Sequence, residues 1–420
     1  MADVQPLRAL HYDQAVAGPL QDLVAPPYDV IDLPARAALQ ARSPHNVVAI
    51  DLPDGNDPYA TAANTLRAWI DEGAVVRDPE PAIWALVQDY TAPDGRRLTR
   101  RGFLARVRVE DYGAGRIRPH ERTHPGPKED RLRLTRATQA NLSPIFSLYS
   151  DPGGAAWAAL QPHIGGAPWG EAVDEDGTAH QLHRVTDAAA HEAVHAALAG
   201  AELLIADGHH RYETARVYAE EVGGEGDHRY VLMCLVALED EGLTVFPTHR
   251  LVQGTTPETQ EALAATLREH FEIEPTTLEE LASPESDGPL VMGYLDAHFK
   301  KPFRLTLRDQ AIADAALAGM PEPYRRLDTA IVEALLLTGP LGLTEHDIAE
   351  LHGLGYARSA QDGIDLVSSG QYDLGFFLRP TPVTQVRAVA AEGVSMPPKS
   401  TYFFPKVITG MLFNPLGEEG

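Results

Sequence analysis

The sequence predicts a mixed α/β protein. Apolar runs of strand length alternate with segments of helical spacing, and Pro-, Gly- and Asp-rich turns separate them. Two of the runs, Leu203–Ala206 and Tyr230–Leu238, are apolar at consecutive positions, which is typical of strands buried on both faces. With 44% hydrophobic and 23% charged residues among 420, the chain has the composition of a folded globular protein of two or three packed units.

The first predicted part, residues 1–150, opens with a short strand in "RALHYD". A helix is predicted from after Asp32 to near Ser43, and a strand over Asn46–Leu52. A second helix is predicted over Tyr59–Glu72, since Gly73 follows where a helix stops. Alternating apolar residues on both sides of a Pro-Asp-Gly turn then predict a hairpin.

The second predicted part, residues 151–254, is expected to contain the scaffold of the site. Its pattern predicts a helix, a polar strand pair, and a helix in "TDAAAHEAVHAALAG". The strand Leu203–Ala206, a helix to Val222 and the strand Tyr230–Leu238 follow. Such a strand, helix and strand predict a crossover onto a buried sheet.

The third predicted part, residues 255–420, begins with a capped helix, because Thr256 precedes Pro257 and Glu258. "GPLVMGYLDAHFKKPFRLTLRD" predicts two strands, and "LDTAIVEALLL" predicts a core helix. Neither an internal repeat nor a low-complexity tract is evident in the sequence.

Charge and cysteine content exclude several classes of protein. Lys and Arg number 35 and Asp and Glu 60, so the formal charge of −25 repels a polyanionic duplex and argues against a nucleic-acid partner. A single cysteine, Cys234, excludes an internal disulfide framework and a multi-cysteine zinc site. Without an apolar run of signal-peptide or membrane-span length, we expect a cytoplasmic protein with no membrane partner.

The stretch "ADGHHR" points most strongly to function. A helix N-terminus attracts anions, because its unpaired N–H groups carry about half a positive charge. Gly208 allows close approach of the backbone, while His209, His210 and Arg211 add donors, so phosphate is the expected ligand. Asp207 is expected either to cap the helix, which is favoured, or to hold Mg²⁺ against a phosphate.

A second stretch, residues 116–138, is locally basic, with seven Lys or Arg against three acids. A solvated charge run is one interpretation. The concentration of donors around a Pro-Gly-Pro turn favours a cradle for a polyphosphate instead. The candidate donors are His120, Arg122, His124, Lys128, Arg131 and Arg133.

Two other stretches carry polar groups between prolines. "MPPKSTYFFPK" offers Lys399, Ser400, Thr401 and Lys406 as donors, although the glycines of a Walker motif are absent and a rigid loop is the alternative. "APPYDVI" holds Asp29 on a restricted backbone, where it could act as a general base or form the turn.

Together, "APPYDVI", "HERTHPGPKEDR", "ANLSPIFSLY", "ADGHHRYETA", "LDTAIVEALLL" and "MPPKSTYFFPK" resemble the bacterial and archaeal family catalogued as domain of unknown function 1015. The "DGHHR" segment is similar to the turn of the ParB/sulfiredoxin superfamily, which includes kinases of free serine. The resemblance implies a ParB/sulfiredoxin-like core with elaborations. It also implies nucleotide phosphates bound by Gly208, His209, His210 and Arg211.

Departures from that superfamily narrow the expected activity. Sulfiredoxins have a cysteine in the turn, where this chain has His209 or His210, and the sequence shows neither the helix-turn-helix nor the basic surface of ParB proteins. The serine kinases use an N-terminal glutamate as base. Asp29 and Glu121 are the candidates for that role here.

We therefore expect a nucleotide-dependent phosphotransferase that acts on a small hydroxylated metabolite, free serine first. The expected cofactors are ATP or ADP, with CTP as a further option, and Mg²⁺ near Asp207. His209 and His210 are expected to act as acid/base groups or as hydrogen-bond donors to phosphate. A phosphatase or nucleotide hydrolase is the first alternative, and a nucleotide-sensing binding protein without turnover is the second. The oligomeric state stays open, a homo-oligomer included.

Overall fold

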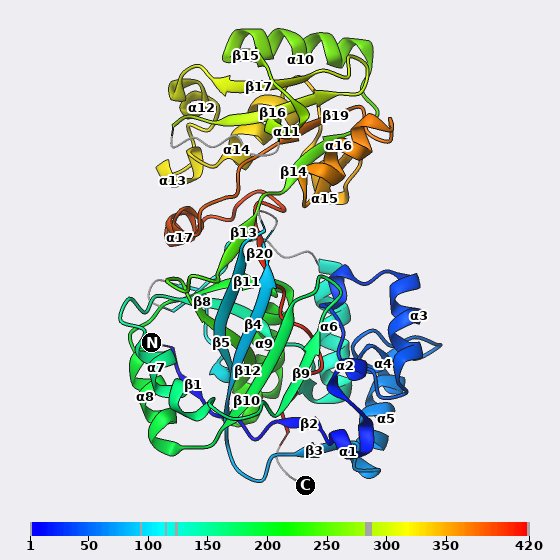
Figure 1. The fold of residues 1–420 in the computed structure, drawn as a ribbon, viewed down its shortest axis with the longest axis vertical. Helices are drawn as coiled ribbons and strands as arrows, with labels where there is room; N and C mark the ends of the chain where they lie inside the picture. The colour runs from blue at the N-terminus through cyan, green and yellow to red at the C-terminus, as the bar shows by residue number, and fades with distance from the viewer. Residues whose placement is uncertain (1, 93–94, 114–115, 122–124, 282–287, 418–420) are drawn as a thin grey trace. The chain divides into compact units, whose positions relative to one another are not determined.

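The chain forms two compact units, each of which is described by itself (Figure 1). The computed structural model describes residues 2–92, 95–113, 116–121, 125–281 and 288–417. Unit 1 comprises residues 1–119, 123–243 and 405–420, and unit 2 comprises residues 120–122 and 244–404. The predicted mixed α/β class is confirmed, while the division into three parts at residues 150 and 254 stays a prediction.

The elements of unit 1 follow one another as strands and mostly short helices. The strands are β1 (Val4–Gln5), β2 (Leu10–Tyr12), β3 (Val75–Arg77), β4 (Ile83–Thr91), β5 (Arg97–Arg108), β6 (Ile117–Arg118), β7 (Ala140–Asn141), β8 (Ile145–Tyr149), β9 (Gly170–Val173), β10 (Ala179–Val185), β11 (Leu203–Asp207), β12 (Tyr230–Ala237) and β21 (Asn414–Pro415). The helices are α1 (Gln14–Ala17), α2 (Leu20–Leu23), α3 (Leu33–Arg42), α4 (Val48–Asp51), α5 (Pro58–Asp71), α6 (Pro125–Thr138), α7 (Ala155–Leu160), α8 (Ala188–Leu198) and α9 (His209–Val222), with 3₁₀ turns η1 (Tyr28–Val30), η2 (Gln161–His163) and η3 (Asp227–Arg229).

A large sheet forms the framework of unit 1. Its strand order is β6, β11, β8, β12, β5, β4, β10 and β9, with β1 paired to β5. The predicted hairpin is confirmed, since β4 and β5 pair antiparallel from Trp84 opposite Leu104 to Thr91 opposite Arg97. The helices predicted after Asp32 and over residues 59–72 are confirmed as α3 and α5, and the side chains of Asp32 and Asp57 cap them.

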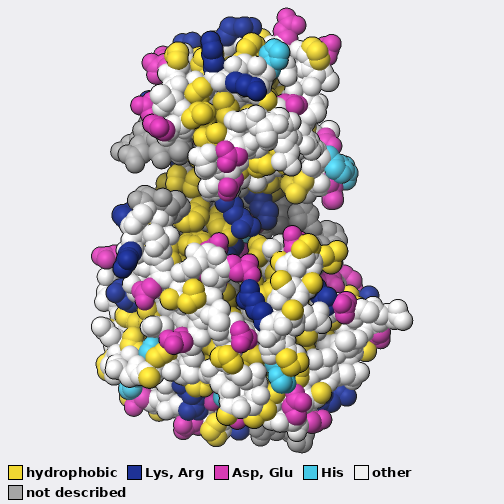
Figure 2. Space-filling model, turned by 45° about the vertical axis from the view of Figure 1, so that its right-hand side comes forward, with side chains coloured by type: hydrophobic (Ala, Val, Ile, Leu, Met, Phe, Trp, Pro, Cys, Tyr) yellow, Lys and Arg dark blue, Asp and Glu magenta, His cyan; other side chains and the backbone are white. Residues whose placement is uncertain are grey.

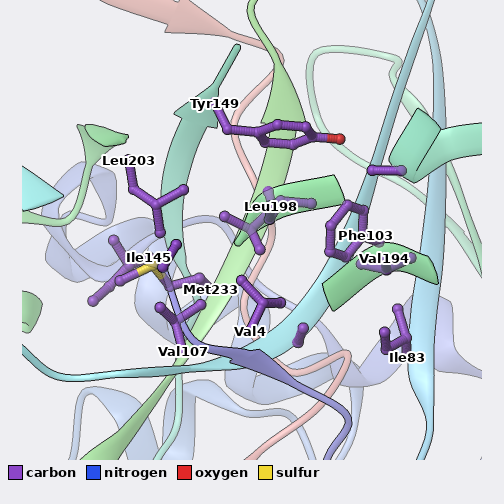
Figure 3. Packing of buried hydrophobic residues seen from close by; sticks show 14 of the residues in the cluster. Val4, Ile83, Phe103, Val107, Ile145, Tyr149, Val194, Leu198, Leu203 and Met233 are labelled. Carbon is purple, nitrogen blue, oxygen red and sulfur yellow. The ribbon is translucent and has the colours of Figure 1, made fainter. Parts of the chain in front are cut away.

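One face of this sheet carries the main core of unit 1 (Figure 3). Alternate residues of the strands, such as Phe103 and Val107 of β5 and Met233 of β12, meet Val194 and Leu198 of α8. All five residues are 0% exposed. Each large apolar side chain buried in this way contributes about 1.5–3 kcal/mol, so this core stabilises the sheet and its packing against α8.

The strand, helix and strand predicted around "DGHHR" are confirmed as β11, α9 and β12, but they do not form the crossover that joins parallel strands. β11 and β12 both pair with β8, which lies between them, β11 antiparallel and β12 parallel. The two strands joined by α9 therefore run in opposite directions. Apart from Asp207 at the end of β11, both strands are apolar and almost entirely buried, as expected of strands covered on both faces of a sheet.

The strand predicted over Asn46–Leu52 is wrong. This segment contains the short helix α4, and the side chain of Asn46 explains its start. Asn46 Oδ1 accepts a hydrogen bond from Val48 N at 3.0 Å, while its Nδ2 donates to the carbonyls of Asp22 and Val24. Asparagine favours such local bonds over a strand ladder, so the apolar run turns at this point.

Unit 2 is built on a second sheet, with strand order β15, β17, β16, β19, β14 and β18, and a separate pair of β13 with β20. Its strands are β13 (Thr244–Phe246), β14 (His249–Val252), β15 (Phe271–Pro275), β16 (Val291–Asp296), β17 (Pro302–Leu307), β18 (Leu354–Ala357), β19 (Leu374–Phe377) and β20 (Tyr402–Phe404). Its helices are α10 (Pro257–His270), α11 (Leu278–Leu281), α12 (Gln310–Ala316), α13 (Glu322–Arg325), α14 (Asp328–Val332), α15 (Glu345–Glu350), α16 (Ala360–Ser368) and α17 (Val383–Ala391), with the π-helical turn η4 (Glu333–Leu337).

The predictions for this part of the chain are confirmed. Thr256 caps α10 with a reciprocal capping box to Thr259. The two predicted strands are β16 and β17, paired antiparallel. "LDTAIVEALLL" is helical as α14 and η4, and it buries apolar side chains against the sheet.

A buried histidine makes the stability of unit 2 depend on pH. His249 has no exposed surface, and its Nδ1 accepts a hydrogen bond from Leu378 N at 3.1 Å, which requires the neutral ring. Burial, together with the neighbouring Arg250, lowers the pKa of His249 to about 4.

We expect acidification to destabilise unit 2 through His249. The unfolded chain takes up this proton near pH 6.5 and the folded chain only near pH 4, so between these values the unfolded state binds more protons and stability falls as pH falls. From pH 7 to pH 5 this group should cost about 2 kcal/mol. Urea unfolding at both pH values should show a smaller loss for His249→Asn, which keeps an acceptor for Leu378 N. An equal loss in both proteins would refute the assignment.

Among the described residues, none of the helices has the length and hydropathy that crossing a membrane requires. Figure 2 shows acidic and basic side chains interspersed with apolar ones over the surface in view. On the face in view the acidic side chains are thus spread out, and the basic groups described below are exceptions to the overall charge of −25.

Candidate functional site

The stretch "ADGHHR" folds into the strand, turn and helix that the sequence predicts. Gly208 has a left-handed backbone with φ of 97°, and α9 begins at the next residue. Other residue types adopt this conformation only at a cost, which explains the glycine. The predicted cap by Asp207 is wrong, since no side chain caps α9 and the carboxylate of Asp207 faces two cations instead.

Arg211 bends back over this turn. Its Nη2 donates to Asp207 Oδ2 at 2.9 Å, and its Nη1 donates to Ser143 Oγ at 3.0 Å and to the carbonyl of Pro144. A Cβ on residue 208 would lie 3.0 Å from Arg211 Nε. Gly208 thus serves both the backbone turn and the packing of the guanidinium.

The second cation on Asp207 comes from the C-terminal end of the chain. Lys406 Nζ lies 3.1 Å from Asp207 Oδ1, and the three charged side chains are 11–20% exposed. Burial alone would raise the pKa of Asp207, but Lys406 and Arg211 outweigh it and hold the pKa well below its usual range. Asp207 is therefore a carboxylate anion held between two cations at the start of a helix.

A second ion pair lies close to the first. Arg131 Nη1 donates to the carbonyl of Asp51 at 2.7 Å and lies 3.2 Å from Asp51 Oδ1, and both side chains are more than nine-tenths buried. The guanidinium also stacks on Tyr28, 4.3 Å from the ring centroid. Burial raises the pKa of Asp51, and Arg131 and Arg211 offset part of the rise. Burial also raises the pKa of Tyr28 to about 12.

Arg211 and the Asp51–Arg131 pair line one cavity of about 40 Å³ in unit 1, whereas Asp207 and Lys406 are not among its lining residues. Its polar walls include Tyr28, Asp51, Arg131, Ser143 and Arg211. A space of this size holds water and not a nucleotide. Four stretches singled out in the sequence, "APPYDVI", "HERTHPGPKEDR", "ANLSPIFSLY" and "ADGHHRYETA", contribute to its walls, so the fold of unit 1 brings them together.

Asp51, Ser143 and Thr409 are residues that sequence reasoning missed. Thr409 Oγ1 lies 3.2 Å from Ser143 Oγ, and Ser143 accepts from Arg211. A single carboxylate at the end of the apolar run "NVVAID" was the available signal for Asp51. No comparable signal marks Ser143 or Thr409, which are ordinary residues in the sequence.

Other predicted residues of unit 1 lie on the elements around this cavity. Lys128 Nζ is 3.6 Å from Glu213 Oε2, an ion pair between α6 and α9. Asp29 is exposed on η1 and acts electrostatically on both Tyr28 and Asp51. His209 is buried and lowers the pKa of Asp207, while His210 is half-buried on the first turn of α9.

His120 and Glu121 belong to unit 2. His120 Nε2 lies 3.0 Å from Thr401 Oγ1, and the carbonyl of His120 accepts from Met396 N at 2.8 Å. Glu121 acts electrostatically on Tyr356. Arg122 and His124 lie outside the described residues, and the predictions for them are not tested.

The loop with Lys399, Ser400 and Thr401 also belongs to unit 2. Lys399 has a left-handed backbone with φ of 54°, and Arg250 Nη1 donates to its carbonyl at 3.1 Å. Ser400 is buried and donates to the carbonyl of Pro397 at 2.7 Å. Hydrogen bonds to Arg250, Thr381 and Pro397 thus hold the loop within unit 2. That it shares a site with Arg211 stays a prediction.

A magnesium site formed by protein groups alone finds no support among the described residues, since they contain no cluster of three or more His, Cys, Asp or Glu. Mg²⁺ in phosphate sites is usually held by one or two carboxylates together with the phosphates and water. Asp207 fits that smaller role, because each of its oxygens accepts from one cation and has lone pairs left.

Replacing Gly208 with alanine should impair the site beyond its effect on the backbone. The left-handed conformation costs about 1–2 kcal/mol, and the new Cβ would push Arg211 away from Asp207. Gly154→Ala is a matched control, because Gly154 at the N-cap of α7 also has a left-handed backbone, with φ of 64°, but open space around it. Thermal unfolding should shift similarly in both variants, while nucleotide binding should weaken only in Gly208→Ala. Equal binding by both would refute the role of Gly208 at the site.

Comparison with known proteins gives one family match. The family model described as "Protein of unknown function (DUF1015)" matches residues 4–330. None of the curated proteins matches the chain.

Several solved structures are weakly similar. A conserved hypothetical protein from Pyrococcus furiosus has 15% identity and a TM-score of 0.35, over 69% of this chain and 87% of that chain. A free serine kinase in complex with AMP has 14% identity and a TM-score of 0.35, over 69% and 83%. SbnI with a C-terminal truncation, from Staphylococcus aureus, has 14% identity and a TM-score of 0.37, over 73% and 85%. Likenesses this weak carry no information about what this chain binds.

Proposed function

The chain belongs to the DUF1015 family, and we propose that it is a nucleotide-dependent phosphotransferase that acts on a small hydroxylated metabolite, with free serine as the leading substrate. One observation carries the proposal: Arg211 and Lys406 hold a carboxylate between them at the N-terminus of α9. A phosphate is an anion like the carboxylate, and its oxygens accept hydrogen bonds from the same cationic donors.

In this proposal Asp207 holds the place of a phosphate group. The phosphates of the nucleotide would accept the hydrogen bonds that Arg211 and Lys406 now donate to Asp207. They would also accept hydrogen bonds from the backbone N–H groups of Gly208 and His209. Asp207, released from its ion pairs, would turn to Mg²⁺ carried by the nucleotide. All three side chains keep 11–20% of their surface exposed, which supports such an exchange.

The acceptor hydroxyl would lie on the side of Arg131 and Tyr28. Asp29 is the candidate base in unit 1, since it is exposed and carries its charge beside these groups. Glu121 in unit 2 stays a second candidate. Phosphoryl transfer needs mainly positioning and neutralisation of charge, and two arginines, a lysine and a helix N-terminus supply both.

The resemblance of the Gly208–Arg211 turn to the phosphate-binding turn of the ParB/sulfiredoxin superfamily supports a nucleotide as the donor. ATP and ADP are the first candidates, and CTP is the third. The cavity of about 40 Å³ is too small for any of them, so the nucleotide would bind at the Asp207 group outside this cavity.

The experiment is product analysis with the purified protein, Mg²⁺ and each nucleotide, with and without serine. We expect phosphoserine together with one equivalent of dephosphorylated nucleotide. Phosphate release that is independent of serine would replace the proposal with a nucleotide hydrolase. Nucleotide binding without either product would replace it with a sensor.

A further inference from the structure

Unit 2 contains a hollow that is lined mainly by apolar side chains. Its volume is about 390 Å³, and residues of α10, β15, β16 and β17 form its walls. The apolar side chains among them include Leu263, Leu267, Ile273, Phe303 and Leu305. Pockets for small molecules have volumes in this range and are mostly apolar, with a few polar groups that orient the ligand.

Two apolar side chains of this hollow are exposed to water. Phe299 is 68% exposed and Ile273 is 40% exposed. Single exposed apolar residues are common in proteins. These two, however, line the same hollow as Leu263, Leu267 and Leu305, each of which is at most 5% exposed. A ligand with an apolar body would therefore remove contiguous apolar surface from water, which favours binding.

The turn that carries Phe299 is held by hydrogen bonds. Asp296 Oδ1 accepts from His298 N at 2.8 Å and from Phe299 N at 3.0 Å, and the carbonyl of Asp296 accepts from Lys300 N at 2.8 Å. Lys300 has a left-handed backbone with φ of 51°. The turn between β16 and β17 thus keeps Phe299 at the hollow while most of its ring is in water.

The charged groups at the hollow favour a ligand with a single negative charge. Arg268 and Lys301 line it and are exposed, and neither makes an ion pair or a side-chain hydrogen bond with another residue that the structure describes. Asp296 is only 4% exposed, and its Oδ2 accepts from Tyr294 Oη at 3.2 Å, so both of its carboxylate oxygens are already used. The formal charge of the lining is +1.

We propose that this hollow binds a small amphipathic carboxylate. The apolar body of the ligand lies between α10 and β17 beneath Phe299, and its head group accepts charge-assisted hydrogen bonds from Arg268 and Lys301. The site is additional to the proposed phosphotransfer, whose donors Arg211 and Lys406 belong to unit 1.

Calorimetric titration of the full chain with octanoate, without nucleotide or Mg²⁺, tests the proposal. Octanol lacks the charge and acetate lacks the apolar body, so each removes one part of the proposed recognition. The variants are Arg268→Gln and Phe299→Ser. Arg387→Gln is the control for the first, since Arg387 is also an exposed arginine on a helix of unit 2, without a partner among the described residues, and does not line the hollow. Leu278→Ser is the control for the second, since Leu278 is 44% exposed and lies outside the lining.

We expect saturable binding of octanoate that Arg268→Gln and Phe299→Ser each weaken by about fivefold or more, while both controls stay within about twofold of the wild type. Octanol and acetate should both bind more weakly than octanoate. All four substitutions replace exposed side chains, so we expect folded variants, and circular dichroism checks this.

Three results would overturn the proposal: no saturable binding of octanoate, equal affinities of both variants and their controls, or binding of octanol as tight as that of octanoate. Self-association of the chain that Phe299→Ser abolishes, without octanoate binding, would instead assign the hollow to a contact between two copies of this chain.

Discussion

Arg211→Ala is expected to lower the phosphotransfer efficiency, kcat/KM, by at least about 100-fold. The substitution removes the cation that spans Asp207, Ser143 and Pro144, so both the charge and the shape of the proposed phosphate site are lost. Arg211→Lys should recover only part of the activity, because an ammonium cannot make these bonds with a planar fork. Steady-state rates of product formation measure both effects.

Arg216→Ala is the matched control for this prediction. Arg216 lies on the same helix and makes ion pairs with Asp111 and Glu213, but it does not line the cavity. Its variant should stay within about twofold of the wild type. If Arg211→Ala, shown by circular dichroism to be folded, is as active as Arg216→Ala, the catalytic site lies elsewhere.

Asp51→Asn is expected to lower the free energy of unfolding by about 3–5 kcal/mol. The substitution leaves Arg131 as a buried charge without its buried counter-ion, while its other carboxylate partner, Asp130, is 45% exposed. The double variant Asp51→Asn, Arg131→Met should be more stable than Asp51→Asn alone, since it removes the uncompensated charge. Urea or thermal unfolding of both proteins checks the result.

The pair of Arg36 with Asp54 provides the control for Asp51. Its N–O distance is 2.8 Å, but Asp54 is 69% exposed, so water and salt screen the interaction. Asp54→Asn should cost at most about 1 kcal/mol. Similar losses for both substitutions would mean that burial does not set the strength of the Asp51 pair.

Much of the local structure could be predicted because it depends on neighbours in the chain. Asp57 and Thr256 cap α5 and α10, and these helices begin where the pattern predicts. The error at residues 46–52 has the opposite cause, because the structure of this segment depends on contacts that are distant in the chain. Asn46 reaches the carbonyls of Asp22 and Val24, more than 20 residues away, and apolar alternation does not reveal that contact.

The candidate site was predictable in part. Gly208 stands out because a tight turn from a strand into a helix favours glycine. His209, His210 and Arg211 stand out because two histidines and an arginine have few structural reasons to follow a buried strand. The role of Asp207 was not predictable, since its partner Lys406 is 199 residues away. Ser143 is 68 residues from Arg211, and Asp51 is 80 residues from Arg131.

By itself, the sequence determined the mixed α/β class, the turn at Gly208 and the residue types available for binding phosphate, because spacing, caps and turn chemistry act over a few residues. Only the tertiary structure decided which of those residues meet. It assigned Arg131 and Arg211 to one cavity of unit 1, and His120 and Thr401 to unit 2. Ion pairs in a folded protein join groups that are far apart in the chain. Sheet order and helix packing decide which of these groups lie close together in space.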